Sequence, residues 1–160
     1  MDLPPGLRID VEDAPAAADL DRIPEGLEAF NEAMWPGHQP FRPLGVFVRD
    51  AAGKILGGLA GGTYGGWLYV RHFWVSEPLR GRGLGREMLA RAERRALARG
   101  SHSVWLDTFS FQAPEFYRRQ GYEVFGELDV PPGYKRIFLR KALATRDGGG
   151  AAATGADGPA

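Results

Sequence analysis

Residues 80–86 read RGRGLGR, and this alternation of glycine and arginine opens a stretch with helical periodicity. Such a loop presents unpaired backbone N–H groups at a helix N-terminus, where the helix dipole is positive. The missing side chains let a ligand approach the backbone closely. The segment therefore predicts an anion site, and phosphate is the anion that this arrangement favours.

Three phosphate-binding motifs compete for this loop. A P-loop needs G-x-x-x-x-G-K-S/T, and no Lys followed by Ser or Thr lies near these glycines. The dinucleotide fingerprint G-x-G-x-x-G begins at Gly81 and Gly83, but it places Arg86 where a small residue must let helix and strand pack closely. Asp107 lies about where that fold's ribose-binding acid would be, so this motif remains an alternative. The third pattern, Q/R-x-x-G-x-G/A, is met by residues 80–85.

A second motif stands downstream of the loop. Residues 113–122, APEFYRRQGY, match the pattern A-x-x-L/F-Y-x-x-x-G-F/Y. With both motifs at the expected spacing, the sequence resembles the GNAT-type N-acetyltransferases. The resemblance covers about residues 44–143, and residues 7–39 align with the family by position alone.

The resemblance implies acetyl-coenzyme A as co-substrate and no metal. In the family the first motif grips the pyrophosphate, and backbone groups at the end of the preceding strand bond the pantetheine arm. This chain departs from the family where an Asn usually contacts the cofactor, because Gln112 stands there in a segment about two residues shorter. Gln112 either replaces that Asn or caps the following helix. The implied cofactor-binding residues are Phe73, Trp74, Val75, Arg80, Gly81, Arg82, Gly83, Leu84, Gly85, Arg86 and Gln112.

Acyl transfer from a thioester to an amine needs a neutral amine, a stabilised oxyanion and a proton for the departing thiolate. The resemblance assigns the oxyanion to backbone N–H groups near Val75 and the proton to Tyr117, which falls on the family's tyrosine. Asp107 corresponds roughly to a position often held by Glu and is the candidate general base. His72, Glu77 or a water chain are alternatives, although His72 shares a predicted strand face with apolar residues, which favours a packed histidine.

The implied function is transfer of the acetyl group of acetyl-coenzyme A to a primary amine by direct attack in a ternary complex. The chain has no Cys, so no cysteine can carry the acyl group as a covalent intermediate. Two alternatives remain open. The chain could bind acyl-coenzyme A as a sensor or scaffold without turnover, or it could be a dinucleotide-binding protein.

Composition is ordinary for a globular domain, with 44% hydrophobic and 25% charged residues in a chain of 160. No apolar stretch approaches the roughly 20 residues that span a bilayer, and the N-terminus lacks a basic region followed by an apolar one. We therefore expect a cytoplasmic protein without a membrane partner. The absence of Cys excludes disulfides and thiolate metal sites. A homodimer is compatible with the sequence.

Charge is distributed unevenly, although the net charge is zero. Residues 1–35 hold nine acids and two bases, whereas residues 36–100 hold eleven bases and four acids. The basic centre suits a polyanionic cofactor, and nucleic acid would call for an overall basic surface, so we expect no nucleic-acid partner. In the family the N-terminal helices border the acceptor side. The acidic excess there predicts a small or peptidyl amine acceptor with additional positive charge, although solvated helix faces also explain part of the split.

The periodicities predict an α+β domain over residues 1–143. Its expected architecture is the GNAT-like acyl-CoA N-acyltransferase fold, a mixed sheet of about seven strands with about four helices. Leu7 to Glu12 alternates as a first strand, and residues 16–34 predict two short helices separated at Pro24. Residues 144–160 are rich in glycine and alanine and predict a disordered tail. The other expected elements are strands at 44–49, 55–64, 67–75, 103–109, 122–128 and 137–143, and helices at 84–99 and 113–119.

The strand over residues 67–75 carries most of the expected site. Simple alternation puts Tyr69, Arg71, Phe73 and Val75 on one face, and Leu68, Val70, His72 and Trp74 on the other. Four glycines in the preceding strand, at positions 57, 58, 61 and 62, predict bulges or a close approach of two backbones. The resemblance further implies that the strand over residues 67–75 ends splayed from its neighbour.

Overall fold

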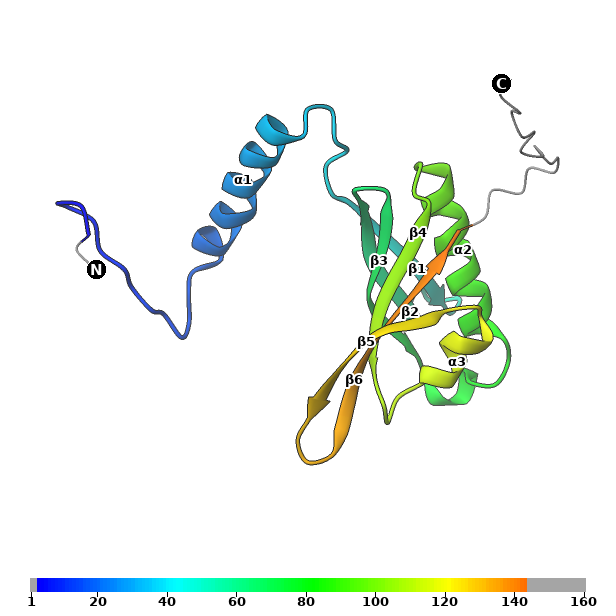
Figure 1. The fold of residues 1–160 in the computed structure, drawn as a ribbon. Coiled ribbons are helices and arrows are strands. Elements are labelled where there is room, and N and C mark those ends of the chain that lie inside the picture. The colour runs from blue at the N-terminus through cyan, green and yellow to red at the C-terminus, as the bar shows by residue number, and fades with distance from the viewer. Residues whose placement is uncertain (1–2, 144–160) are drawn as a thin grey trace, which may run out of the picture. The chain divides into compact units, whose positions relative to one another are not determined.

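A computed structural model describes residues 3–143, and the chain forms two compact units (Figure 1). The first unit, up to Pro40, contains one helix, α1 (Ala17–Met34). The second unit begins at Phe41 and carries the sheet. The predicted tail, residues 144–160, lies outside the described part of the chain, so its disorder stays a prediction.

The first unit corrects two sequence predictions. Residues 7–12 form no strand, and the alternating side chains of Leu7, Ile9 and Val11 are all exposed. Helix α1 continues unbroken through Pro24, where two helices were predicted. A proline removes one backbone hydrogen bond from a helix, and here the bonds on either side of Pro24 keep the chain helical.

The second unit begins with three antiparallel strands, continues with two α-helices on either side of a fourth strand in the chain, and ends with an antiparallel pair. Its elements are β1 (Arg42–Arg49), β2 (Ile55–Tyr64), β3 (Trp67–Val75), the 3₁₀ turn η1 (Glu77–Leu79), α2 (Leu84–Ala98), β4 (Ser103–Phe109), α3 (Pro114–Arg119), β5 (Glu123–Val130) and β6 (Tyr134–Ala142). The strands form one sheet with the order β1-β2-β3-β4-β6-β5, in which β3 and β4 are parallel and the other neighbours are antiparallel. The predicted α+β class with a mixed sheet is confirmed, with six strands and three α-helices among the described residues in place of about seven and four.

The core lies between the sheet and α2, which with α3 covers one side of the strands in Figure 1. Met88, Leu89, Ala92 and Ala96 on α2 are buried, as their spacing of three and four residues predicts. They pack with buried strand residues that include Leu59, Leu68, Val70, Val104, Leu106 and Leu139. This apolar layer holds the N-terminus of α2 and the ends of β3 and β4 in fixed positions.

A β-bulge in β3 changes which side chains share a face. The pairing with β2 shifts between Ala60 and Gly61, so that Ala60 faces His72, Gly61 faces Val70 and Arg71 is the extra residue. A Cβ at Gly61 would collide with the carbonyl oxygen of Tyr69, which explains the glycine and confirms the close approach that the sequence predicts.

Because of the bulge, the simple alternation predicted for β3 holds only up to Val70. Phe73 and Val75 join Leu68 and Val70 against the core, while His72 is exposed. The prediction of a packed His72 is therefore wrong, and a one-residue insertion is the physical reason.

The parallel strands β3 and β4 separate part-way along their length. They pair from Trp67 and Ser103 only as far as Val70 and Leu106. Beyond that point β3 stays paired with β2 up to Val75, and β4 stays paired with β6 up to Phe109. The splayed end implied by the family resemblance is present, and it leaves the backbone edge of residues 71–75 open towards β4.

Candidate active site

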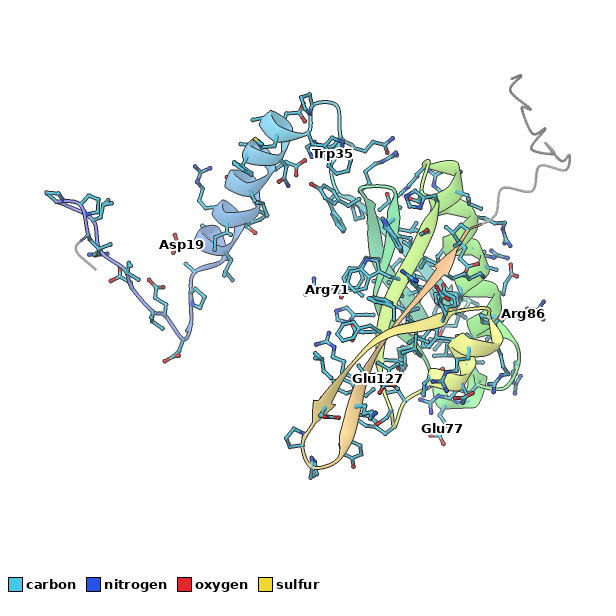
Figure 2. The ribbon with its side chains drawn as sticks, viewed as in Figure 1. Asp19, Trp35, Arg71, Glu77, Arg86 and Glu127 are labelled. Carbon is cyan, nitrogen blue, oxygen red and sulfur yellow. The ribbon has the colours of Figure 1, made fainter. Side chains whose placement is uncertain are left out.

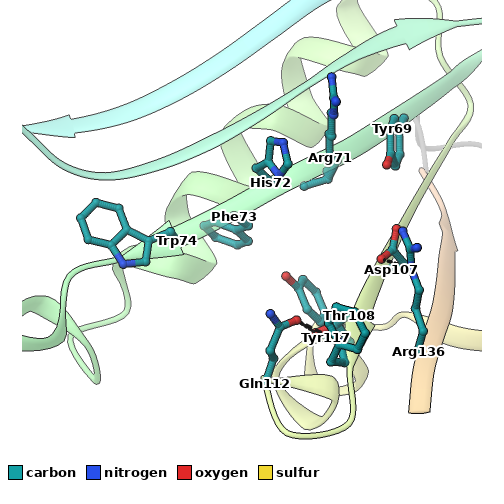
Figure 3. Close-up of a pocket in the computed structure, with 12 residues that line it drawn as sticks. Tyr69, Arg71, His72, Phe73, Trp74, Asp107, Thr108, Gln112, Tyr117 and Arg136 are labelled. Atoms are coloured by element: carbon teal, nitrogen blue, oxygen red, sulfur yellow. Dashed lines mark hydrogen bonds and ion pairs between the residues drawn. The ribbon is translucent and has the colours of Figure 1, made fainter. Parts of the chain in front are cut away.

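A pocket of about 590 Å³ opens where β3 and β4 separate (Figure 3). Small-molecule sites typically measure roughly 300–1,000 Å³. The walls come from β3, β4, the turn after β4, α3 and β6. The lining residues are Tyr69, Val70, Arg71, His72, Phe73, Trp74, Asp107, Thr108, Phe109, Gln112, Tyr117 and Arg136.

Tyr117 reaches this pocket from α3. Its side chain is 7% exposed, and its ring lies 6.5 Å from the ring of Phe73 on the opposite wall. Burial, and secondarily the negative charge of Asp107, raises the pKa of Tyr117 to about 12. The hydroxyl makes no hydrogen bond to another residue within 3–143. Tyr117 is therefore a protonated phenol at neutral pH whose O–H can donate to a ligand.

Asp107 lies on β4 and is held by an ion pair. The Nε of Arg136 on β6 donates to Oδ2 of Asp107 at 2.7 Å, and the Asp107 side chain is only 14% exposed. The hydrogen bond and the charge of Asp107 raise the pKa of Arg136. The pair fixes one carboxylate oxygen, and Oδ1 has no hydrogen-bond partner in the described chain.

The other two candidate bases differ in position. His72 lies on the exposed side of β3 and lines the pocket, as a consequence of the bulge. Glu77 is the first residue of η1, beyond the end of β3, and does not line the pocket. The structure therefore brings Asp107 and His72 to one cavity and leaves Glu77 outside it.

Gln112 does not cap the following helix, as one of the two sequence interpretations had it, because no side chain caps the N-terminus of α3 and Gln112 bonds the end of β4 instead. Its Oε1 accepts hydrogen bonds from the Phe109 amide at 2.9 Å and from the Thr108 hydroxyl at 3.0 Å. These bonds close the turn between β4 and α3. The amide nitrogen of Gln112 points away from Thr108 in Figure 3.

The glycine loop has the geometry of a helix-terminal anion site. Gly81 and Gly83 have φ of 73° and 78°, a left-handed backbone conformation that residues other than glycine rarely adopt. Helix α2 begins at Leu84, and no side chain caps its N-terminus, so the backbone N–H groups of the first turn stay available. Arg80 donates through Nε to the Val75 carbonyl oxygen at 3.0 Å and so ties the loop to the end of β3.

The rings of Phe73 and Phe116 lie between the glycine loop and the pocket. Residues 80–86 do not line the pocket. A Cβ at Gly85 would lie 3.7 Å from the ring of Phe73, which does line it, and 3.5 Å from the ring of Phe116 on α3. An elongated ligand could therefore extend from the loop past Phe73 into the pocket.

Sequence reasoning missed several lining residues. Tyr69 and Arg71 were predicted on a strand face without a role, and Thr108, Phe109 and Arg136 were not singled out. Arg136 is a diagonal neighbour of Asp107 in the pair of β4 with β6, where Asp107 faces Phe138. Only the register between two strands distant in sequence could have revealed that contact.

Comparison with known proteins identifies the family. A family model described as the acetyltransferase (GNAT) family matches residues 14–122. The chain belongs to the acetyltransferase (GNAT) family. The prediction of an acetyl-coenzyme A-dependent acetyltransferase is thereby confirmed at the level of enzyme class, because the family uses acetyl-coenzyme A.

Individual GNAT relatives agree with this assignment. A blasticidin-S acetyltransferase of Streptomyces morookaense is 41% identical over 107 residues, covering 64% of this chain and 79% of the relative. An acetyltransferase of Agrobacterium fabrum is 37% identical over 133 residues, covering 82% and 94%. The crystal structure of a provisionally assigned acetyltransferase from Agrobacterium tumefaciens matches with a TM-score of 0.79 and 32% identity, covering 85% of this chain and 99% of that chain.

Two observations bear on other kinds of site in this GNAT protein. Within residues 3–143, no helix is both long and apolar enough to span a membrane. The same part of the chain holds no group of three His, Asp or Glu side chains arranged to bind a metal ion.

Proposed function

We propose that the chain transfers the acetyl group of acetyl-coenzyme A to a primary amine by direct attack in a ternary complex. The observation that carries this proposal is the separation of β3 from β4 beside a buried, protonated Tyr117. The opening offers one cavity in which a thioester, an amine and a proton donor can meet.

The glycine loop and the open strand edge would hold the co-substrate. The pyrophosphate would bind the free N–H groups at the start of α2, with positive charge from Arg82 and Arg86. The pantetheine arm would pass Gly85 and bond the open backbone edge of residues 73–75. This path would place the thioester between Phe73 and Tyr117.

Tyr117 would assist the leaving group. In the reaction the amine nitrogen forms a bond to the acetyl carbon, the carbon–sulfur bond breaks, and the sulfur receives a proton or a hydrogen bond. A phenol whose pKa is raised to about 12 keeps its proton throughout the neutral range, so its O–H is available to donate a hydrogen bond to the departing sulfur. Backbone N–H groups near the end of β3 would meet the developing oxyanion.

The amine must lose a proton, and Asp107 is the proposed acceptor of that proton. Its Oδ1 is unengaged at the pocket wall, while Arg136 holds Oδ2 in place. His72 lines the same cavity and is the alternative acceptor, directly or through a water molecule. Oδ1 is the better placed of the two because the bond from Arg136 orients the carboxylate.

The acceptor is proposed to be a small-molecule amine. One relative is named for acetylating blasticidin S, which supports a small molecule over a protein substrate. The additional positive charge predicted from residues 1–35 stays a prediction, since those acids belong to the first unit and some of them are paired, as Glu28 is with His38. The cytoplasmic location, the homodimer and the absence of a nucleic-acid partner stay predictions too.

The test is release of free coenzyme A thiol with a panel of primary amines. Thiol release that depends on an amine supports the proposal. Stabilisation by acetyl-coenzyme A without thiol release from any amine would instead support the sensor or scaffold. Stabilisation by NAD, but not by acetyl-coenzyme A, would support the dinucleotide alternative.

A further inference from the structure

The bulge in β3 adds an exposed arginine to the lining of the candidate pocket. Arg71 is the extra residue between Val70 and His72, and both Arg71 and His72 are exposed and line the cavity. In Figure 3 their side chains rise from the same stretch of β3. Without the inserted residue the two side chains would point to opposite faces of the sheet.

Arg71 is a cation without a counter-ion. It makes no hydrogen bond and no ion pair with any other residue from 3 to 143. The other arginine of the lining, Arg136, is already bonded to Asp107. Apart from His72, Arg71 and Arg136 contribute two positive charges and Asp107 one negative charge, so these three side chains carry a net charge of +1.

This charge is separate from the phosphate site. Figure 2 shows Arg71 and Arg86 projecting from opposite sides of the sheet unit, with Arg86 on the side of α2. The loop that would hold the pyrophosphate therefore leaves Arg71 without a phosphate to bind. An unpaired guanidinium beside the place of reaction calls for an anionic group on the other substrate.

We propose that the amine acceptor also carries a carboxylate and that Arg71 binds it. A guanidinium offers parallel N–H donors that match the two oxygens of a carboxylate. The amine end would then lie towards Asp107 on the pocket wall, and the carboxylate beside Arg71. This inference rests on the proposed acetyl transfer and specifies its substrate class. It does not conflict with a further cationic group elsewhere on the acceptor.

The experiment compares matched acceptors that differ only in a carboxylate or a carboxamide remote from the reacting amine. The pair 6-aminohexanoate and 6-aminohexanamide is suitable, together with longer and shorter homologues, because the remote group leaves the amine's basicity almost unchanged. The wild-type protein should show a lower KM for the carboxylates, by about 10- to 100-fold, as for a hydrogen bond to a charged group.

Variants of Arg71 identify the group responsible. Arg71→Gln should remove the difference between the two series, and Arg71→Lys should restore part of it by keeping the charge without the fork. Arg95→Gln is the matched control, because Arg95 is exposed in the last turn of α2, remote from the pocket lining. It should keep the full preference.

A parallel binding measurement separates this inference from the proposed function. Thermal stabilisation of the coenzyme A-bound protein by the carboxylates should be lost in Arg71→Gln. If no amine is acetylated, but the carboxylates stabilise the wild-type protein and not Arg71→Gln, the proposed acetyl transfer is wrong and the carboxylate site at Arg71 is supported. If amines are acetylated and the two series react alike in the wild type, or Arg71→Gln keeps the preference, the carboxylate inference is overturned.

Discussion

Replacing Tyr117 by Phe removes one hydroxyl from the centre of the pocket and changes little else. The ring is 7% exposed and packs edge-on against the rings of Phe116 and Tyr122, contacts that phenylalanine keeps. The hydroxyl has no hydrogen-bond partner in the described chain, so its loss breaks no internal bond. Stability should therefore change by less than about 0.5 kcal/mol, whereas turnover should fall sharply.

The size of the kinetic effect follows from the loss of the O–H donor that stabilises the departing sulfur. A positioned general acid contributes about 10²–10⁴-fold. Since each tenfold step corresponds to about 1.4 kcal/mol, the variant should lose roughly 3–5 kcal/mol of transition-state stabilisation. The apparent affinity for acetyl-coenzyme A should change little, because the donor acts mainly as the thiolate develops.

Tyr122 provides the matched control. Its hydroxyl donates to Glu93 Oε1 at 2.8 Å, and Glu93 also binds Lys141. The buried Tyr122 hydroxyl therefore contributes to stability through this hydrogen bond. Tyr122→Phe should destabilise the protein by about 1–3 kcal/mol. The melting temperature should fall by roughly 2–4 °C for each kcal/mol, with turnover nearly unchanged.

The assay combines thermal unfolding with free-thiol release at saturating acetyl-coenzyme A for both variants. The predicted pattern is opposite in the two proteins, with activity lost in one and stability lost in the other. A Tyr117→Phe protein that keeps full turnover, or one that loses stability as Tyr122→Phe does, would refute the assigned role of the Tyr117 hydroxyl.

Three further predictions concern the loop, the base and the pH dependence. Gly85→Ala should fold, because the new Cβ makes ordinary contacts at 3.5 Å or more, but acetyl-coenzyme A should stabilise it by less than the wild type's roughly 2.7 kcal/mol at a hundred times the dissociation constant. Gly100→Ala, at the far end of α2 with φ of 85°, should be less stable yet be stabilised by the ligand as much as the wild type. Equal stabilisation of both variants by the ligand would remove the loop from the cofactor site. Asp107→Asn should lower kcat/KM by about 10²–10⁴-fold, while His72→Gln keeps kcat/KM nearly unchanged; the reverse pattern would transfer the role of base to His72. The pKa of Tyr117 is raised from its ordinary value of 10 to about 12, so the folded state holds the proton more tightly than the unfolded state does. The stability that results is complete below pH 10 and is lost as the pH rises from 10 to 12. Over this range the free energy of unfolding should fall less steeply with pH in Tyr117→Phe than in the wild type, and an unchanged slope would contradict the raised pKa.

The parts of the site that depend on local sequence were predictable, and the parts that depend on strand register were not. The loop at 80–86 and the helix after it are encoded by adjacent residues, so their positions follow from spacing alone. The bulge at Arg71 depends on how β2 pairs with β3, and a one-residue shift there reversed the expected side of His72. No local pattern contains that information.

Long-range contacts explain the other differences from the sequence predictions. The bond from Arg136 to Asp107 joins residues 29 positions apart, and it exists because β6 returns to pair with β4. Residues 7–12 have the alternation of a strand but no place in the sheet, which shows that alternation needs a pairing edge before it becomes structure. Helix α1 continued through Pro24 because a single lost hydrogen bond did not outweigh the rest of the helix.

The most direct test of acetyl transfer to an amine follows the acetyl group itself. Acetyl-coenzyme A carrying an isotopic label in the acetyl group is incubated with the protein and an accepted amine, and the amine is analysed by mass spectrometry while free thiol is counted. Direct transfer should give one labelled acetyl group on the amine nitrogen for each thiol released, with no thiol released when the amine is omitted. Thiol released without an amine, or labelled acetyl found on the protein in place of the amine, would contradict direct transfer at the opening between β3 and β4.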